Sequence, residues 1–109
     1  MINDDALSAL AALAHPTRLA TFRLLVRHEP AGLSTGELVE LSGVTQSTFS
    51  THLAVLVKAG LVRSEKRGRQ QIQRAEIGAL SALMIFLAKD CCGGRAELCE
   101  PLVAELTCC

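Results

Sequence analysis

The chain has 109 residues, half of them apolar, and equal numbers of acidic and basic residues leave it without formal net charge. This length is typical of one domain around a single core, since such domains have roughly 50–200 residues. The longest apolar run, 82–88, is much shorter than the about 20 residues that a membrane-spanning helix needs. The chain does not start with the basic and apolar stretch of a secretory signal. We therefore expect a cytoplasmic protein without a membrane partner.

The charges are distributed unevenly along the chain. Residues 42–76 contain six Lys or Arg against two Glu, a net charge of +4, and each flank carries −2. A basic centre of this kind favours contact with phosphate groups, although a solvated charged hairpin would have the same composition. The mean hydropathy of +0.33 is high for a small chain. It indicates that some apolar surface is buried against a second copy.

Two helices are predicted at the start of the chain. Leucines and an alanine at helical spacing follow Asn3 and Asp4, which are candidate N-caps. Pro16 interrupts this helix and suits the first turn of the next one. The apolar positions of the two helices are Leu7, Leu10, Leu13 and Ala14, then Leu19, Phe22, Leu25 and Val26. A loop is expected over 28–33, because it contains both proline and glycine.

A helix-turn-helix is predicted next. Ser34 and Glu37 have the spacing of a capping box, and a short helix with three apolar residues follows. Gly43 breaks the chain, and Thr45 can cap a longer helix that ends at Gly60. The apolar residues of the short helix are Leu38, Val39 and Leu41, and those of the longer helix are Phe49, Leu53, Leu56 and Val57.

The last part of the chain predicts a hairpin and one more helix. Short strands over 61–66 and 71–75 flank a turn at 67–70. A helix follows from Ile77 to Lys89, and its second half is apolar on every side, so it should be covered on two sides. The fold class is therefore mainly α with a small β-hairpin, in the order ααααββα. We expect residues 1–90 to form one folded domain and residues 91–109 to form a cysteine-rich tail.

Two helices joined by a glycine-containing turn and followed by a basic hairpin have the order of a winged helix-turn-helix. The helix from Gln46 to Lys58 presents short hydrogen-bonding side chains opposite its apolar face. Such side chains reach base edges and phosphates in a major groove, although an ordinary surface helix would look similar. The candidate DNA-binding residues are Gln46, Ser47, Thr48, Ser50, Thr51, Lys58, Arg67 and Arg69.

The motifs of the chain support a family assignment. The segments 14–19, 38–41, 44–53 and 56–62, which include His-Pro-Thr-Arg and Gln-Ser-Thr-Phe-Ser-Thr-His-Leu, together resemble the ArsR/SmtB family of metal-sensing repressors. The resemblance implies a homodimer formed through the first and last helices, which binds an inverted repeat in operator DNA. It places the helix 45–58 in the major groove and Arg67 and Arg69 at the tip of the wing. It also implies that His52 packs structurally, and we interpret His15 and His28 in the same way.

All five cysteines lie in the last 19 residues, which in a cytosolic chain indicates metal ligation or redox chemistry. The stretch 36–41, which carries the inducer thiols in one branch of the family, has no cysteine, and 77–89 has no histidine for a zinc site. Cys91, Cys92 and Cys99 resemble the cysteines of arsenic-responsive members. We therefore expect trivalent arsenic, or antimony, to bind these three thiols as the inducer.

Other readings of the cysteines remain open. Zinc, cadmium or lead would be the alternative inducers, and a tetrahedral zinc or cadmium site would need Cys108 or Cys109 as a further ligand. A thiol redox sensor, with Cys99 as the resolving thiol, is another alternative. A thiol enzyme such as a reductase is not expected, because the thiols follow the end of a helix, where the dipole disfavours a thiolate. No catalytic cofactor is expected either.

Overall fold

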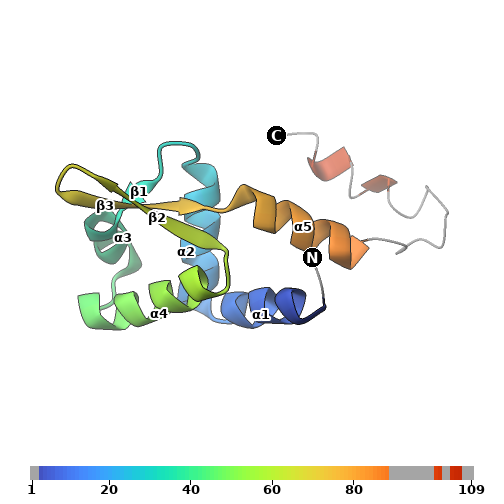
Figure 1. Cartoon of the computed structure of the whole chain (residues 1–109), viewed down its shortest axis with the longest axis horizontal. Helices are drawn as coiled ribbons and strands as arrows, with labels where there is room; N and C mark the ends of the chain where they lie inside the picture. The colour runs from blue at the N-terminus through green and yellow to red at the C-terminus, as the bar shows by residue number, and fades with distance from the viewer. Residues whose placement is uncertain (1–2, 89–99, 102–103, 107–109) are drawn as a thin grey trace.

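A computed structural model describes residues 3–88, 100–101 and 104–106 of the chain. Its main part contains five helices and three strands, in the order predicted apart from one added strand (Figure 1). The elements are α1 (Asn3–Leu13), α2 (Pro16–Arg27), β1 (Leu33–Ser34), α3 (Thr35–Ser42), α4 (Gln46–Lys58), β2 (Val62–Arg67), β3 (Gln70–Ala75) and α5 (Ile77–Ala88). The predicted fold class, a mainly helical winged helix-turn-helix, is confirmed.

Local capping explains where three of the helices begin. The backbone N–H of Thr17 donates to Nδ1 of His15 at 3.1 Å, and Pro16 occupies the first turn of α2. The capping box at α3 is present in full: the N–H of Glu37 donates to Oγ of Ser34 at 3.2 Å, and Oε1 of Glu37 accepts from the N–H of Ser34 at 3.0 Å. At α4, Oγ1 of Thr45 accepts a hydrogen bond from the N–H of Thr48 at 3.3 Å and so caps the helix.

The sheet has three antiparallel strands in the order β1-β3-β2. β2 and β3 pair from Val62 with Ala75 to Arg67 with Gln70, so the turn consists of two residues rather than the four expected from the sequence. Gly68 has φ 63° in this turn, a conformation that favours glycine. β1 was expected to be a loop and a helix cap. It pairs with β3 over two residues only, and so short a strand has no periodicity to detect.

The core lies where the helices and the sheet meet. Its largest fully buried side chains are Leu25 of α2, Leu38 of α3, Phe49 and Leu56 of α4, and Leu61. α4 packs on α1, α2 and the hairpin, so its buried face is fixed from several sides. Val57 was predicted to lie on that face, but it is 41% exposed because it lies on the edge of the apolar stripe.

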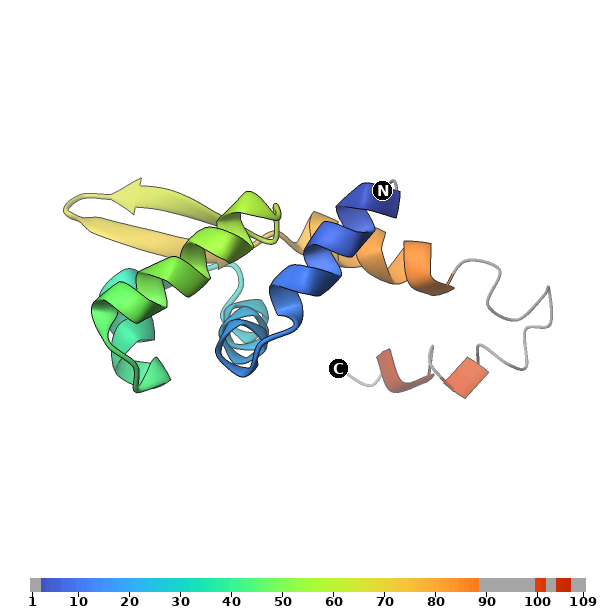
Figure 2. The ribbon, with the colours of Figure 1, turned by 90° about the horizontal axis from the view of Figure 1, so that it is seen from below.

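α1 and α5 contact each other at the end of the molecule opposite the hairpin tip (Figures 1 and 2). α1 turns its alanines at positions 6, 9 and 12 inward, whereas Leu7 is 57% exposed. On α5, Leu83 is buried, and Ile85 and Leu87 are 65% and 55% exposed. Both helices therefore present large apolar side chains to the outside.

In the part of the chain that the structure describes, no helix is long and apolar enough to span a membrane.

Candidate nucleic-acid interface

α4 has two chemically different faces. Phe49, Leu53 and Leu56 are buried against the core. Capping by Thr45 and the glycine turn before it fix the start of the helix. All six residues that the sequence predicted on the outer face are exposed: Gln46, Ser47, Thr48, Ser50, Thr51 and Lys58.

These exposed side chains differ in whether they already make hydrogen bonds within the protein. The hydroxyl of Thr45 donates to Oγ1 of Thr48 at 2.9 Å, and that of Thr51 donates to the carbonyl of Ser47 at 3.2 Å. The side chains of Gln46, Ser47 and Ser50 make no hydrogen bond to any other residue that the structure describes. Their donors and acceptors are therefore available to a partner without breaking an internal contact.

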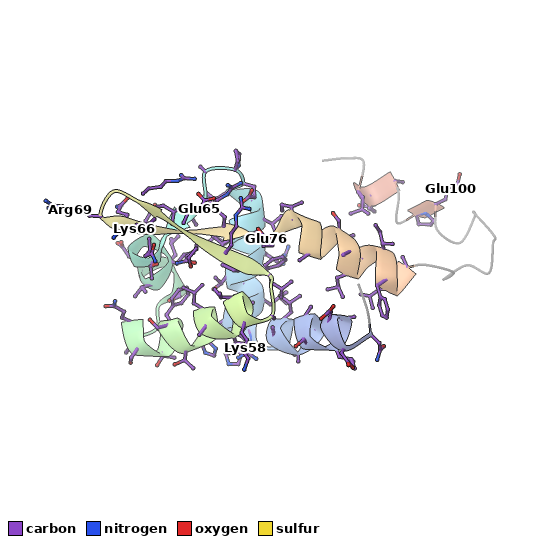
Figure 3. The ribbon with its side chains drawn as sticks, viewed as in Figure 1. Lys58, Glu65, Lys66, Arg69, Glu76 and Glu100 are labelled. Atoms are coloured by element: carbon purple, nitrogen blue, oxygen red, sulfur yellow. The ribbon has the colours of Figure 1, made fainter. Side chains whose placement is uncertain are left out.

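The hairpin of β2 and β3, which we call the wing, carries some cations that are paired with carboxylates and some that are not. Arg69 lies in the hairpin turn and Lys66 near the end of β2, and neither has an ion-pair partner among the described residues (Figure 3). Arg67 is the last residue of β2, and its guanidinium donates to Oε2 of Glu65 at 2.9 Å and to the carbonyl of Ala31 at 3.1 Å. The family resemblance implied that Arg67 and Arg69 have the same role at the tip of the wing. In the structure they differ, because Arg67 is bound to Glu65 and Ala31, whereas Arg69 has no ion-pair partner among the described residues.

An ion-pair network crosses the hairpin. Arg74 of β3 donates to both carboxylate oxygens of Glu29, at 3.2 and 2.8 Å, and to Glu65 at 2.9 Å. Arg63 contacts Glu76 at 3.2 Å. The hydrogen bond from Arg74 lowers the pKa of Glu29, and those from Arg74 and Arg67 lower the pKa of Glu65. Both carboxylates are therefore ionised at neutral pH.

The network reduces the charge that the sequence suggested for the centre of the chain. Of the six cations at 42–76, those of Arg63, Arg67 and Arg74 are paired with carboxylates. The alternation of Arg63, Glu65 and Arg67 was a usable signal, because residues two apart share one face of a strand. The part played by Glu29 had no such signal, because it reaches the sheet from the loop after α2.

Arg18 and His52 connect α4 to α1. Arg18 of α2 donates through Nε to the carbonyl of Ala12 at 2.6 Å, and its Nη1 lies 3.2 Å from Nδ1 of His52. The rings of His15 and His52 are 4.2 Å apart. Burial, followed by the charges of His15 and Arg18, lowers the pKa of His52. His52 thus makes internal contacts, whereas the sequence gave no sign of what Arg18 binds.

The predicted inducer ligands Cys91, Cys92 and Cys99, and the further candidates Cys108 and Cys109, lie outside the described residues. Within 3–88, 100–101 and 104–106, no three His, Cys, Asp or Glu residues are grouped so that they could hold a metal ion. The inducer site therefore stays a prediction.

The sequence of the chain is similar to that of known regulators. Residues 13–65 match a helix-turn-helix domain family. The chain is 29% identical to the HTH-type transcriptional regulator YgaV of Escherichia coli (strain K12), over 82% of this chain and 88% of that protein. It is 37% identical to the "Probable mercury resistance operon repressor" of Streptomyces lividans, over 54% of this chain and 45% of that protein.

Solved structures agree with this similarity. An ArsR-like transcriptional regulator from Rhodococcus sp. RHA1 has a TM-score of 0.72 and 30% identity, covering 93% of this chain and 89% of its own. A "Possible transcriptional regulator for arsenical resistance" has a TM-score of 0.65 and 31% identity, covering 90% and 95%. The homodimeric winged helix-turn-helix domain of Mb0332 from Mycobacterium bovis has a TM-score of 0.63 and 28% identity, covering 80% and 81%.

The fold and the exposed polar helix define the class of winged helix-turn-helix DNA-binding regulators. Within that class, the chain belongs to the ArsR family of transcriptional regulators. Its relatives in the comparisons are transcriptional regulators rather than enzymes.

Proposed function

We propose that the chain is a homodimeric repressor that inserts α4 into the major groove of operator DNA and is released when trivalent arsenic binds its C-terminal cysteines. The observation that carries the DNA-binding part is the outer face of α4. Gln46, Ser47 and Ser50 expose hydrogen-bonding groups there that have no partner among the described residues, and Lys58 ends the same helix. Such groups read base edges, and Lys58, Lys66 and Arg69 supply cations for the phosphates.

The dimer is supported by the apolar side chains on α1 and α5. Leu7, Ile85 and Leu87 are more than half exposed in the single chain. Pairing these helices with a second copy would remove apolar surface from water. Because α1 and α5 lie opposite the hairpin tip (Figure 2), a two-fold axis beside them would hold the two α4 helices apart, one for each half-site. The homodimeric state of Mb0332 is consistent with this arrangement.

The inducer proposal depends on the number and type of the thiols. Cys91 and Cys92 are adjacent, and Gly93 and Gly94 follow them before Cys99. Glycines allow backbone angles that other residues avoid, so this linker suits a chain reversal that would bring the third thiol close. Trivalent arsenic takes three soft sulfur ligands, which this set supplies. Antimony has the same preference. Two relatives are described by their names as regulators of mercury resistance and of arsenical resistance, which supports a thiophilic inducer.

Fluorescence anisotropy tests this proposal. The probe is a duplex enriched from a random-sequence library by the wild-type protein, hereafter the selected duplex. We expect stoichiometric arsenite to release the wild type. Cys91→Ser, Cys92→Ser and Cys99→Ser should each bind the duplex normally and fail to respond. The double variant Cys108→Ser with Cys109→Ser is the matched control and should respond normally.

Other outcomes would identify the alternatives. Release by zinc, cadmium or lead but not arsenite, lost in the double tail variant, would replace the three-thiol site by one that uses Cys108 or Cys109. Release by a thiol oxidant that dithiothreitol reverses, without any response to metal ions, would make the chain a redox sensor. Failure of the library to yield any preferred sequence would overturn the DNA-binding part itself.

A further inference from the structure

One carboxylate in the wing contacts several arginines. Oε1 of Glu65 lies 2.9 Å from Nη1 of Arg74 and 3.4 Å from Nη2 of Arg63. Its other oxygen, Oε2, accepts from Arg67 at 2.9 Å. Glu65, which is labelled in Figure 3, therefore contacts three cations of the hairpin.

Strand geometry produces this cluster. Arg63, Glu65 and Arg67 occupy alternate positions of β2, so their side chains leave the same face of the strand. The register places Arg74 of β3 directly opposite Arg63, and like charges in that position repel each other. Glu65 is two residue pairs further along the hairpin and lies between Arg63 and Arg67 on the same face of β2. Its ionised carboxylate offsets their repulsion.

The three arginines are not equally committed to the protein. The side chain of Arg74 is only 18% exposed and is bound through two hydrogen bonds to Glu29, which is also 18% exposed. The side chains of Arg63 and Arg67 are each 49% exposed. Exposed ion pairs contribute little to stability. A DNA phosphate could therefore compete with Glu65 for Arg67. Arg74 would stay with Glu29, and Arg63 would keep its nearer partner Glu76, at 3.2 Å.

We propose that Glu65 limits sequence-independent DNA binding, because it holds the guanidinium of Arg67 away from the phosphate backbone. This inference rests on the proposed function, since it needs a DNA-binding wing. Lys66 and Arg69 have no such partner among the described residues and supply the phosphate contacts of the wing. Phosphate contacts are the same on every sequence, so each extra one raises the affinity for unrelated DNA as well as for an operator.

The test compares Glu65→Gln with Glu40→Gln. Both substitutions remove one negative charge, but Glu40 is an exposed residue of α3 without an ion-pair partner in the described part of the chain. The probe is a scrambled duplex of the same length as the selected duplex, and its affinity is measured by anisotropy across a range of salt concentrations. For Glu65→Gln we expect a several-fold increase in affinity for the scrambled duplex. The slope of log K against log salt should become steeper by about one unit, since each phosphate neutralised adds about 0.9.

A double-mutant cycle assigns the effect to the released arginine. Arg67→Gln in the wild type should change the salt slope little, because Glu65 already occupies that guanidinium. Arg67→Gln in the Glu65→Gln background should remove about one unit of the added slope. The double variant also controls for a loosened hairpin, because loosening alone would not be reversed by removing Arg67. A melting curve for each variant checks that the fold is retained.

The outcomes separate this inference from the function on which it rests. An equal change for Glu40→Gln and Glu65→Gln would mean that only net charge matters and would overturn the role of Glu65. An unchanged slope for Glu65→Gln, in a protein that still prefers the selected duplex, would overturn this inference and leave the proposed function standing. Absence of binding to either duplex by the wild type would overturn both.

Discussion

Gly32 lies in the loop that connects α2 to β1, and its backbone has φ +72°. A Cβ at this position would come within 2.6 Å of the carbonyl oxygen of Gln73 and 2.8 Å of side-chain atoms of Ile72 and Arg74. The backbone conformation and the close approach both require glycine. The sequence indicated a turn here but not this contact, because the contact involves β3, about 40 residues further along the chain.

Gly32→Ala should therefore lower the free energy of unfolding by about 1–3 kcal/mol or more, the usual cost of a strained backbone position. Gly36→Ala is the matched control. Gly36 is in α3, and its Cβ would meet only Oγ of Ser34 at 4.0 Å. Alanine is the better helix former, so this change should be neutral or stabilise the protein by up to about 1 kcal/mol. Urea unfolding measures both, and equal effects of the two changes would contradict the assignment.

His52 predicts a pH dependence of stability. The guanidinium of Arg18 has only donors, so Nδ1 of His52 accepts its hydrogen bond and the imidazole is neutral. Burial and nearby positive charge lower the pKa of His52 below its ordinary value of 6.5. As the pH falls through 6.5, the unfolded chain therefore binds a proton before the folded one does. The contribution of His52 is complete above this pH and is lost below it.

We expect the melting temperature to fall between pH 7 and 5.5, above the range in which the carboxylates with lowered pKa values respond, since they are ordinarily protonated only near 4.5. His52→Gln keeps an acceptor for Arg18 and should flatten this decline. His28→Gln changes an exposed histidine at the end of α2 and should keep it. A decline that persists unchanged in His52→Gln would assign the effect to another group.

At the scale of elements, helices could be predicted well because their signals are local. The capping box at Ser34 and the proline at position 16 fix helix starts within a few residues of chain. Which face of α1 is buried could not be predicted in this way. The helix buries Ala6, Ala9 and Ala12, because small side chains allow close packing, and leaves Leu7 and Leu10 exposed. The larger residues therefore did not mark the face that contacts this chain's own core.

α5 gives a prediction that separates folding from association. From the sequence, a charge at Leu83 or at Leu87 would disrupt the dimer alike. The structure distinguishes them, because Leu83 is 4% exposed in the single chain and Leu87 is 55% exposed. Leu83→Glu should bury an unpaired charge in the core and unfold the protein, with a loss of several kcal/mol.

Leu87→Glu should keep the fold and still unfold cooperatively, but its sedimentation coefficient should shift from that of a dimer to that of a monomer. Ser81→Glu is the matched control, since it adds the same charge at an already exposed position of α5. A dimer that persists in Leu87→Glu would exclude the outer face of α5 from the interface.

At the scale of the whole molecule, the charge pattern of the sequence was only partly informative. The sequence located the basic centre, yet folding brings Glu29 from another segment onto Arg74 and pairs Arg67 with Glu65. Among the described cations of residues 42–76, Lys58 of α4 and Lys66 and Arg69 of the hairpin have no ion-pair partner and remain for a nucleic acid. The order of elements and the polar face could be predicted from local patterns. The pairing of the charges could not, because it depends on tertiary contacts.

The central claim is that α4 reads DNA from a symmetric dimer, and hydroxyl-radical footprinting on the selected duplex tests it most directly. The wild type should protect two patches about one helical turn apart, related by the symmetry of an inverted repeat. Gln46→Ala with Ser47→Ala should lose the preference for the selected over the scrambled duplex, by about 1–3 kcal/mol for each base contact removed. A single protected patch, or a footprint and preference unchanged by these substitutions, would contradict the account.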